Sequence, residues 1–170
     1  ACANIPSGAR NAKAAWLYPT RARRYDWAMD IRRITPAYAV SPQITPEDAA
    51  RIAAEGFATI LCNRPDAEVP PQVQQDAIRA AAEAAGLTFV SHPITHATLD
   101  DAAVDRQMEV CAAAAGPVLA YCATGTRCSV VWSLGQAGTL PVDEILSAVA
   151  RHGYDLEALR PRIEARATAG

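Results

Sequence analysis

The sequence predicts an α/β fold in three layers, with helices on both faces of a mainly parallel sheet of four to five strands. Three glycines, Gly56, Gly86 and Gly116, are spaced 30 residues apart. Each ends an alanine-rich helical stretch and is followed at once by an apolar run, as where AIRAAAEAAG precedes LTFVSHPI. Helix, glycine in the left-handed position, then strand is the order expected of alternating α/β units, and about 30 residues is the length of one unit.

The first elements begin soon after residue 29. ITPAYAVS, residues 34–41, is predicted to form a short first strand. In the helix that follows, Thr45 is placed to cap the N-terminus and Pro46 occupies the first helical position. The strand that ends at Cys62 is the next apolar run. Cys62 is therefore expected to be a buried thiol of the core.

Helices dominate the second half of the chain. A third helix is predicted at about 100–115, and its apolar positions recur at helical spacing: Val104, Met108, Cys111 and Ala115. The last strand ends at Cys122, and the segments after it read as helices, the last of them broken at Pro161. Right-handed crossovers between parallel strands would place ligands beyond the carboxyl ends of the strands, where Cys122 lies.

Composition favours one globular domain at residues 29–170, preceded by an N-terminal extension at 1–28. The extension carries five basic residues and one acid, whereas the remainder has 11 basic and 17 acidic residues, a net charge of −6. Near-neutral charge and the lack of a long apolar run argue against nucleic acid or a membrane as partner. The five cysteines form no C-x-x-C pair and no cluster with the three histidines. We therefore expect free thiols, a cytoplasmic location, no metal site and no cofactor.

The stretch PVLAYCATGTRC, residues 117–128, contains the strongest candidate site. A thiolate is the reactive form of cysteine, and its formation near neutral pH needs local positive potential. The small residues that follow Cys122 can turn their backbone N–H groups inward around an anion, and Gly125 can adopt a positive φ. A helix that starts near Arg127 adds its dipole and a guanidinium that fits two oxygens of a phosphate or sulfate. We predict Cys122 as a nucleophile, with Arg127 and an oxyanion-binding loop formed by Ala123, Thr124, Gly125 and Thr126.

From residue 29 onward the chain resembles the phosphatase-like domain of the beta-lactamase hydrolase-like family. The matching stretches are NRPDAE (63–68), AAEAAGLTFVSHPI (81–94), GPVLAYCATGTRCSVVW (116–132) and VDEILSAVARHGYDL (142–156). The resemblance implies a phosphotyrosine-phosphatase-like fold, close to the dual-specificity phosphatases. The family usually has Arg, Ser, Gly, Thr, Arg and Ser after the cysteine, so Ala123, Thr124 and Cys128 depart from it. A thiol at 128 would donate a hydrogen bond to the nucleophile more poorly than a hydroxyl. Cys128 would otherwise serve as a resolving thiol for an oxidised Cys122 or as a buried core residue.

Two reactions start from such a thiolate, and they differ in their need for an acid. A phosphatase must protonate the departing alkoxide, and the segment SHPITHATLDD offers His96 and Asp100, the latter also suited to cap the following helix. Four residues separate Cys122 from Arg127, one fewer than in protein tyrosine phosphatases, and this interval resembles the active loop of rhodaneses. The leading hypothesis is thus a cysteine-dependent phosphatase-like hydrolase. The alternatives are a sulfurtransferase that uses a Cys122 persulfide, and a non-catalytic module that binds oxyanions or phosphoproteins.

The segment NRPDAE follows the second strand at the same edge of the sheet as Cys122. Its charged residues, Arg64, Asp66 and Glu68, are expected to support the loop from outside, although a turn stabilised by Asp and Pro also explains the pattern. The predicted partner is a phosphate-, sulfate- or thiosulfate-like anion or a phosphorylated substrate. The oligomeric state is left open.

Overall fold

The computed structural model describes residues 29–169. A five-stranded sheet forms its centre, in the order β1-β2-β5-β3-β4. The strands are β1 (Arg32–Thr35), β2 (Tyr38–Ser41), β3 (Thr59–Cys62), β4 (Thr88–Ser91) and β5 (Val118–Tyr121). Only β1 is antiparallel to its neighbour, while β2, β5, β3 and β4 run parallel. The predicted mainly parallel sheet is confirmed.

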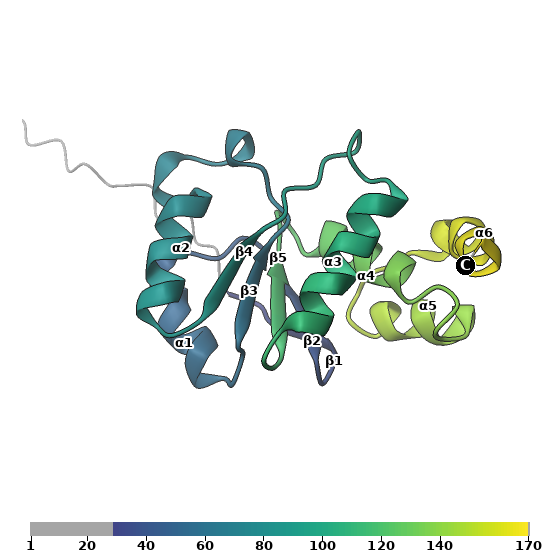
Figure 1. Ribbon diagram of the computed structural model, residues 1–170, viewed down its shortest axis with the longest axis horizontal. Coiled ribbons are helices and arrows are strands. Elements are labelled where there is room, and N and C mark those ends of the chain that lie inside the picture. The colour runs from purple at the N-terminus through teal and green to yellow at the C-terminus, as the bar shows by residue number, and fades with distance from the viewer. Residues whose placement is uncertain (1–28, 170) are drawn as a thin grey trace, which may run out of the picture.

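Helices cover both faces of this sheet, so the three-layer prediction is also confirmed (Figure 1). One face carries α1 (Ala49–Ala54) and α2 (Gln75–Ala84), and an apolar cluster that includes Ile52, Ile78 and Phe89 fills the space beneath them. The other face carries α3 (Asp101–Ala113), α4 (Thr126–Gly135), α5 (Val142–Ala150) and α6 (Arg160–Ala169) over a larger cluster. The three central strands β2, β5 and β3 are fully buried between these layers, as near-continuous apolar runs predict.

The prediction of one strand at 34–41 was wrong, because this segment folds as a hairpin. Pro36 has no backbone N–H to donate and interrupts the ladder. The Thr35 hydroxyl accepts the N–H groups of Ala37 and Tyr38, at 3.3 and 3.0 Å, and so closes the turn. β1 therefore pairs back on β2, and β2 remains beside β5.

The three glycines spaced 30 residues apart do not share one backbone conformation. Gly56 and Gly86 have positive φ after α1 and α2, as predicted. Gly116 does not, and α3 ends earlier, at Ala113. A β-carbon at Gly116 would lie 3.1 Å from the β-carbon of Ala58, so this glycine permits close packing of two loops instead of a left-handed turn.

The expectations for the start of α1 and for the buried thiols are confirmed. Asp48 accepts a hydrogen bond from the Thr45 backbone N–H at 2.8 Å in the short 3-10 helix that leads into α1. The expected break at Pro161 was wrong: α6 begins at Arg160 and runs through Pro161, whose missing N–H is not needed in a first helical turn, and a separate 3-10 turn precedes it. Cys62 is buried and Cys111 is half-buried against the larger cluster. The predicted extension at 1–28, with Cys2, lies outside the described residues.

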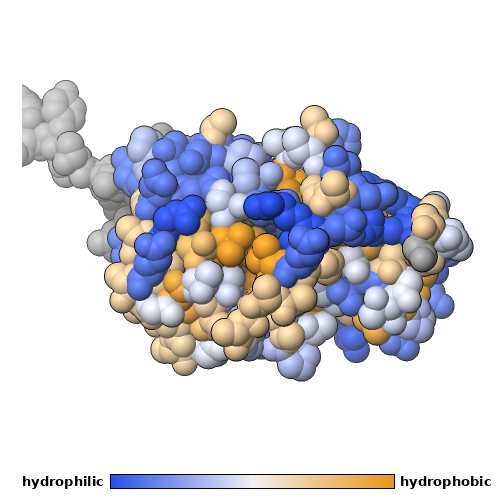
Figure 2. Space-filling model, viewed as in Figure 1, coloured by the Kyte–Doolittle hydropathy of each residue, from blue (hydrophilic) through white to orange (hydrophobic). Residues whose placement is uncertain are grey.

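Strand β4 forms one edge of the sheet, between α2 and α3. The surface seen in Figure 2 has apolar side chains at its centre, with hydrophilic residues on both sides. Val90 on β4 and Val110 on α3 are among the partly buried residues packed on the larger cluster.

Within residues 29–169, none of the helices combines the length and apolar character needed to cross a membrane.

Candidate active site

The candidate site begins where β5 ends at Tyr121 and the next residue is Cys122. Residues 122–125 form a tight loop, and α4 starts at Thr126. Gly125 allows this turn, because its φ of +85° is a conformation that residues with side chains rarely adopt. The loop is tied to the neighbouring strand, since the Cys122 N–H donates to the Ser41 carbonyl and the Gln43 N–H donates to the Ala123 carbonyl, both at 3.4 Å.

Hydrogen bonds converge on the sulfur of Cys122, which is only 2% exposed. The Gly125 N–H donates to this sulfur at 3.2 Å. A hydrogen bond from the Cys128 thiol, followed by the backbone N–H groups of Cys128, Thr124 and Arg127, lowers the pKa of Cys122 to about 5 against the opposing effect of burial. The thiol is thereby favoured as a thiolate at neutral pH.

The Cys128 thiol takes the donor position that the family pattern assigns to a hydroxyl. It lies in the first turn of α4 and is completely buried. Burial and the neighbouring Cys122 raise the pKa of Cys128 well above its ordinary value. Cys128 therefore keeps its proton and can donate it in a hydrogen bond. The expectation that it lies in the core is confirmed, and it also contacts the nucleophile candidate.

Arg127 reaches across the edge of the sheet to the segment after β3. Its Nη1 donates to the Asn63 carbonyl and its Nη2 to Glu68 Oε1, each at 3.0 Å. Glu68 also forms an ion pair with Arg64, whose Nε lies 3.4 Å from Oε2. Arg64 in turn donates to the Gln43 side chain at 3.0 Å. The structure thus places Glu68 in direct contact with Arg127 and links Arg64 to it through Glu68.

Asp66, the third charged residue of that segment, serves a different contact. Its Oδ1 accepts the Gln75 N–H at 2.8 Å, at the start of α2. This carboxylate satisfies a backbone donor that a helix N-terminus otherwise leaves without a partner. Asp66 therefore supports the loop only indirectly, by fixing the segment that carries Glu68.

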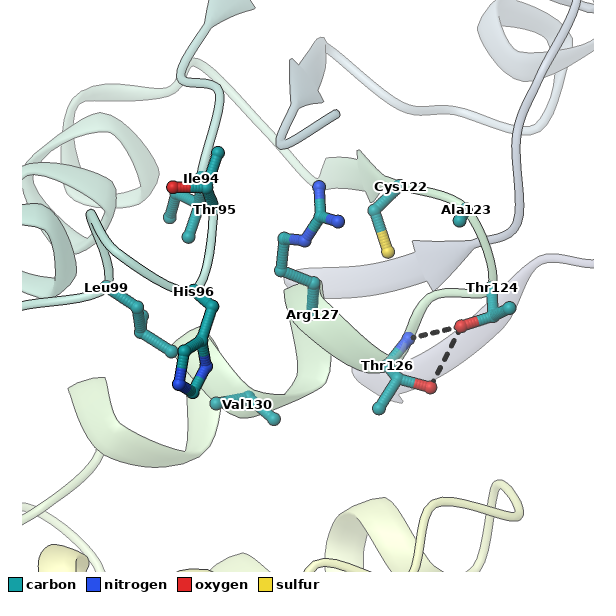
Figure 3. A pocket seen from close by; sticks show the side chains of 10 residues that line it. All are labelled: Ile94, Thr95, His96, Leu99, Cys122, Ala123, Thr124, Thr126, Arg127 and Val130. Carbon is teal, nitrogen blue, oxygen red and sulfur yellow. Dashed lines mark hydrogen bonds between the residues drawn. The ribbon is translucent and has the colours of Figure 1, made fainter. Parts of the chain in front are cut away.

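A pocket of about 330 Å³ opens above this loop (Figure 3). His96 is on its wall, whereas Asp100 is not among its lining residues. Asp100 caps α3 by accepting the Ala103 N–H at 2.8 Å and lines a separate pocket with Arg162 and Arg166. The wall on the His96 side is otherwise largely apolar. The lining residues are Ile94, Thr95, His96, Leu99, Cys122, Ala123, Thr124, Thr126, Arg127 and Val130.

Sequence reasoning missed a chain of buried polar side chains behind the site. The Asn63 side chain donates to Gln107 at 2.8 Å, Gln107 donates to the Tyr38 hydroxyl at 2.9 Å, and Tyr38 donates to the Cys128 carbonyl at 3.1 Å. The chain links the residue that holds Arg127 to the helix that carries Cys128. Asn63 had a recognisable signal, because it directly follows a strand at the edge where Cys122 lies.

No group of three or more acidic, histidine or cysteine side chains within residues 29–169 is arranged to hold a metal ion. The site as described consists of a thiol, an arginine, backbone amides and a histidine. These groups can hold a tetrahedral oxyanion and present a sulfur nucleophile to it.

Residues 30–139 match the family described as "Beta-lactamase hydrolase-like protein, phosphatase-like domain". The chain belongs to this family. The resemblance seen in the sequence is thus confirmed. A beta-lactamase hydrolase-like protein of Xylella fastidiosa (strain Temecula1) is 32% identical over 130 residues. That match covers 75% of this chain but 30% of the relative, so the chain spans less than a third of the relative's length.

Solved structures extend the comparison to the fold. The crystal structure of a putative phosphatase from Neisseria meningitidis z2491 is 38% identical, with a TM-score of 0.72, over 80% of this chain and 97% of that one. TpbA of P. aeruginosa, in a structure with phosphotyrosine, is 16% identical with a TM-score of 0.56, over 86% and 99% of the chains. The phosphotyrosine-phosphatase-like fold is confirmed, and the domain is phosphatase-like.

Proposed function

We propose that this domain is a cysteine-dependent phosphatase in which Cys122 is the nucleophile. The observation that carries the proposal is the convergence of hydrogen bonds on a buried sulfur whose pKa is lowered to about 5, at the base of a pocket that Arg127 lines. The substrate class is a phosphate monoester, in keeping with the phosphatase-like family and with the phosphotyrosine bound by TpbA.

The proposed reaction has two steps. The Cys122 thiolate attacks phosphorus, a sulfur–phosphorus bond forms and the ester oxygen leaves. Arg127 and backbone N–H groups of the loop at residues 123–127 hold the three phosphoryl oxygens as negative charge redistributes. Water then attacks the phosphocysteine, inorganic phosphate leaves and the thiolate is restored.

His96 is the proposed proton donor to the leaving oxygen. It is the lining residue, apart from Cys122 and Arg127, whose side chain can exchange a proton. In its imidazolium form it would give a proton to the departing alkoxide, and in the second step the neutral ring would accept one from water. Asp100, the other acid predicted from the sequence, is engaged as the cap of α3 and lies outside the lining.

A sulfurtransferase is the second candidate function, favoured by two observations. The lining of the pocket contains no carboxylate, and four residues separate Cys122 from Arg127. Sulfite leaves thiosulfate as an anion and needs no acid, so a persulfide on Cys122 could form in the same cradle. A module that binds an oxyanion without turnover would use the same loop.

A parallel assay separates the three functions. The wild type, Cys122→Ser and His96→Gln are compared for hydrolysis of an aryl phosphate and for thiocyanate formation from thiosulfate and cyanide. The phosphatase proposal requires phosphate release that Cys122→Ser abolishes and His96→Gln slows. Unchanged release by Cys122→Ser would refute it. Thiocyanate formation with an added sulfur on Cys122 would establish the sulfurtransferase instead, and phosphate binding without either reaction would establish the binding module.

A further inference from the structure

Tyr154 connects the end of the fold to the loop that follows Cys122. It lies in the turn after α5 and is buried. Its hydroxyl donates a hydrogen bond to the Thr124 carbonyl at 3.1 Å. Burial raises the pKa of Tyr154, so the phenol keeps its proton and remains a donor. The contact joins residues that are 30 positions apart in the sequence.

This contact controls the direction of one peptide group. The carbonyl of Thr124 and the N–H of Gly125 belong to the same planar trans peptide, so they point in opposite directions. Because Tyr154 holds the carbonyl on the outside, the N–H is directed at the Cys122 sulfur, which it reaches at 3.2 Å. Rotation of this peptide would lose both hydrogen bonds together. Gln43 acts in the same way on the preceding peptide through the Ala123 carbonyl.

We propose that Tyr154 is a positioning residue, whose hydroxyl holds the Thr124–Gly125 peptide in the orientation that stabilises the Cys122 thiolate and the bound oxyanion. The proposal rests on the function proposed above, because it assigns Tyr154 to the anion-binding loop of that site. Tyr154 itself does not line the pocket, so it acts on the reaction only through the loop.

Two neighbouring features fit this role. A β-carbon at Gly125 would overlap the Tyr154 hydroxyl, so glycine at this position allows both the turn and the close approach of the phenol. The Arg32 guanidinium lies over the Tyr154 ring, 5.0 Å from its centroid, and donates to the His152 carbonyl at 3.0 Å. Arg32 thereby fixes the turn that presents Tyr154.

The test measures the thiolate directly and does not need turnover. Alkylation of Cys122 by iodoacetamide is followed by peptide-resolved mass spectrometry at pH 5.5 and pH 8.5 in the wild type and in Tyr154→Phe. We expect alkylation about threefold slower at pH 5.5, the result of a tenfold weaker ionisation of the thiol, and equal rates at pH 8.5. Inorganic phosphate should protect Cys122 from alkylation in both proteins, but Tyr154→Phe should need a several-fold higher phosphate concentration than the wild type.

Tyr121→Phe is the matched control. Tyr121 is also a buried tyrosine, but its hydroxyl finds no nitrogen or oxygen partner within residues 29–169, and its removal should leave alkylation unchanged. A folded Tyr154→Phe protein with wild-type alkylation at pH 5.5 and wild-type protection by phosphate overturns the proposal. If Tyr154→Phe does not fold, Arg32→Met takes its place. It should slow alkylation at pH 5.5 in the same direction, and an unchanged rate in that variant overturns the proposal.

Aryl phosphate hydrolysis, measured alongside, separates this inference from the proposed function. If the wild type releases no phosphate while Tyr154→Phe still weakens alkylation and phosphate protection, the phosphatase proposal fails and the role of Tyr154 stands. If the wild type is active and Tyr154→Phe changes neither alkylation at pH 5.5 nor protection by phosphate, only the proposed role of Tyr154 fails.

Discussion

Removal of the Cys128 thiol should make the Cys122 thiolate harder to form. The hydrogen bond from Cys128 is the largest cause of the lowered pKa of Cys122, and the donor is completely buried. Cys128→Ala deletes the donor, whereas Cys128→Ser replaces it with a hydroxyl that can donate in the same direction. The two substitutions therefore separate the hydrogen bond from the packing of the side chain.

The size of the effect follows from the strength of such a bond. A hydrogen bond to a charged group contributes about 1.5 to 3 kcal/mol, and about 1.4 kcal/mol corresponds to a tenfold change in an ionisation constant. From a pKa of about 5, Cys128→Ala should move the titration of Cys122 to roughly pH 6 to 7 by this arithmetic. At pH 5.5 the thiolate fraction would fall from about three quarters to one quarter or less.

The assay is the pH dependence of Cys122 alkylation between pH 4 and 9, resolved by peptide mass spectrometry because Cys62, Cys111 and Cys128 are also free thiols. Cys128→Ala should shift the midpoint upward, and Cys128→Ser should leave it at or below the wild-type value. The free energy of unfolding, measured in urea, checks that each variant is folded under the assay conditions. A Cys128→Ala protein that titrates with the wild-type midpoint would refute the assignment of Cys128 as donor.

Four further outcomes are expected. The pKa of Cys122 is lower in the folded protein than the ordinary value of about 8.5, so its ionised form adds stability that is complete above that pH and disappears as pH falls through about 5. In urea unfolding, the free energy of unfolding of the wild type should exceed that of Cys122→Ser by an amount that grows from pH 5.5 to 8.5. Glu68→Gln removes a partly exposed ion pair with Arg127. Such a pair contributes about 0.5 to 1 kcal/mol, so the phosphate concentration that protects Cys122 should rise about two- to fivefold. Arg127→Met should abolish phosphate protection and leave alkylation at pH 7 nearly unchanged. Gly125→Ala should unfold at a lower urea concentration and lose both the fast alkylation of Cys122 at pH 5.5 and its protection by phosphate. The new β-carbon would overlap Tyr154, and the φ at this position is positive.

The sequence allowed prediction of features whose physical cause is local. The alternation of helices and strands followed from glycine and alanine patterns within single 30-residue units. Cys122, Gly125 and Arg127 could be placed together because one strand end, one turn and one helix start hold them within six positions of the chain. The hairpin at residues 32–41 escaped prediction, since the Thr35 side chain that closes it looks like any strand residue.

Contacts between distant segments could not be predicted in this way. Glu68 and Arg127 are 59 residues apart, and their ion pair exists because β3 and β5 are neighbours with carboxyl ends at one edge. The strand order that makes them neighbours is a property of the whole sheet. The same holds for Tyr154, which lies between two predicted helices and had no assigned role in the sequence analysis, but which the turn after α5 places against the loop. Asp100 shows the converse, because its local pattern also predicted a helix cap, and the structure has that cap.

In the proposed function, different groups stabilise the Cys122 nucleophile and recognise the anion. Among the main causes of the lowered pKa of Cys122, Arg127 acts through its backbone N–H, and the thiol and amides supply the rest. The guanidinium is instead held at the side by Asn63 and Glu68. Hydrogen bonds fixed by the fold cost no rearrangement when substrate arrives, and they stabilise the thiolate before any anion enters. In the proposed reaction the guanidinium of Arg127, beside its ion pair with Glu68, would interact with the incoming oxyanion, which must approach a sulfur that is already negative. An arrangement in which Arg127 alone stabilised the thiolate would have to weaken that interaction in order to bind the substrate.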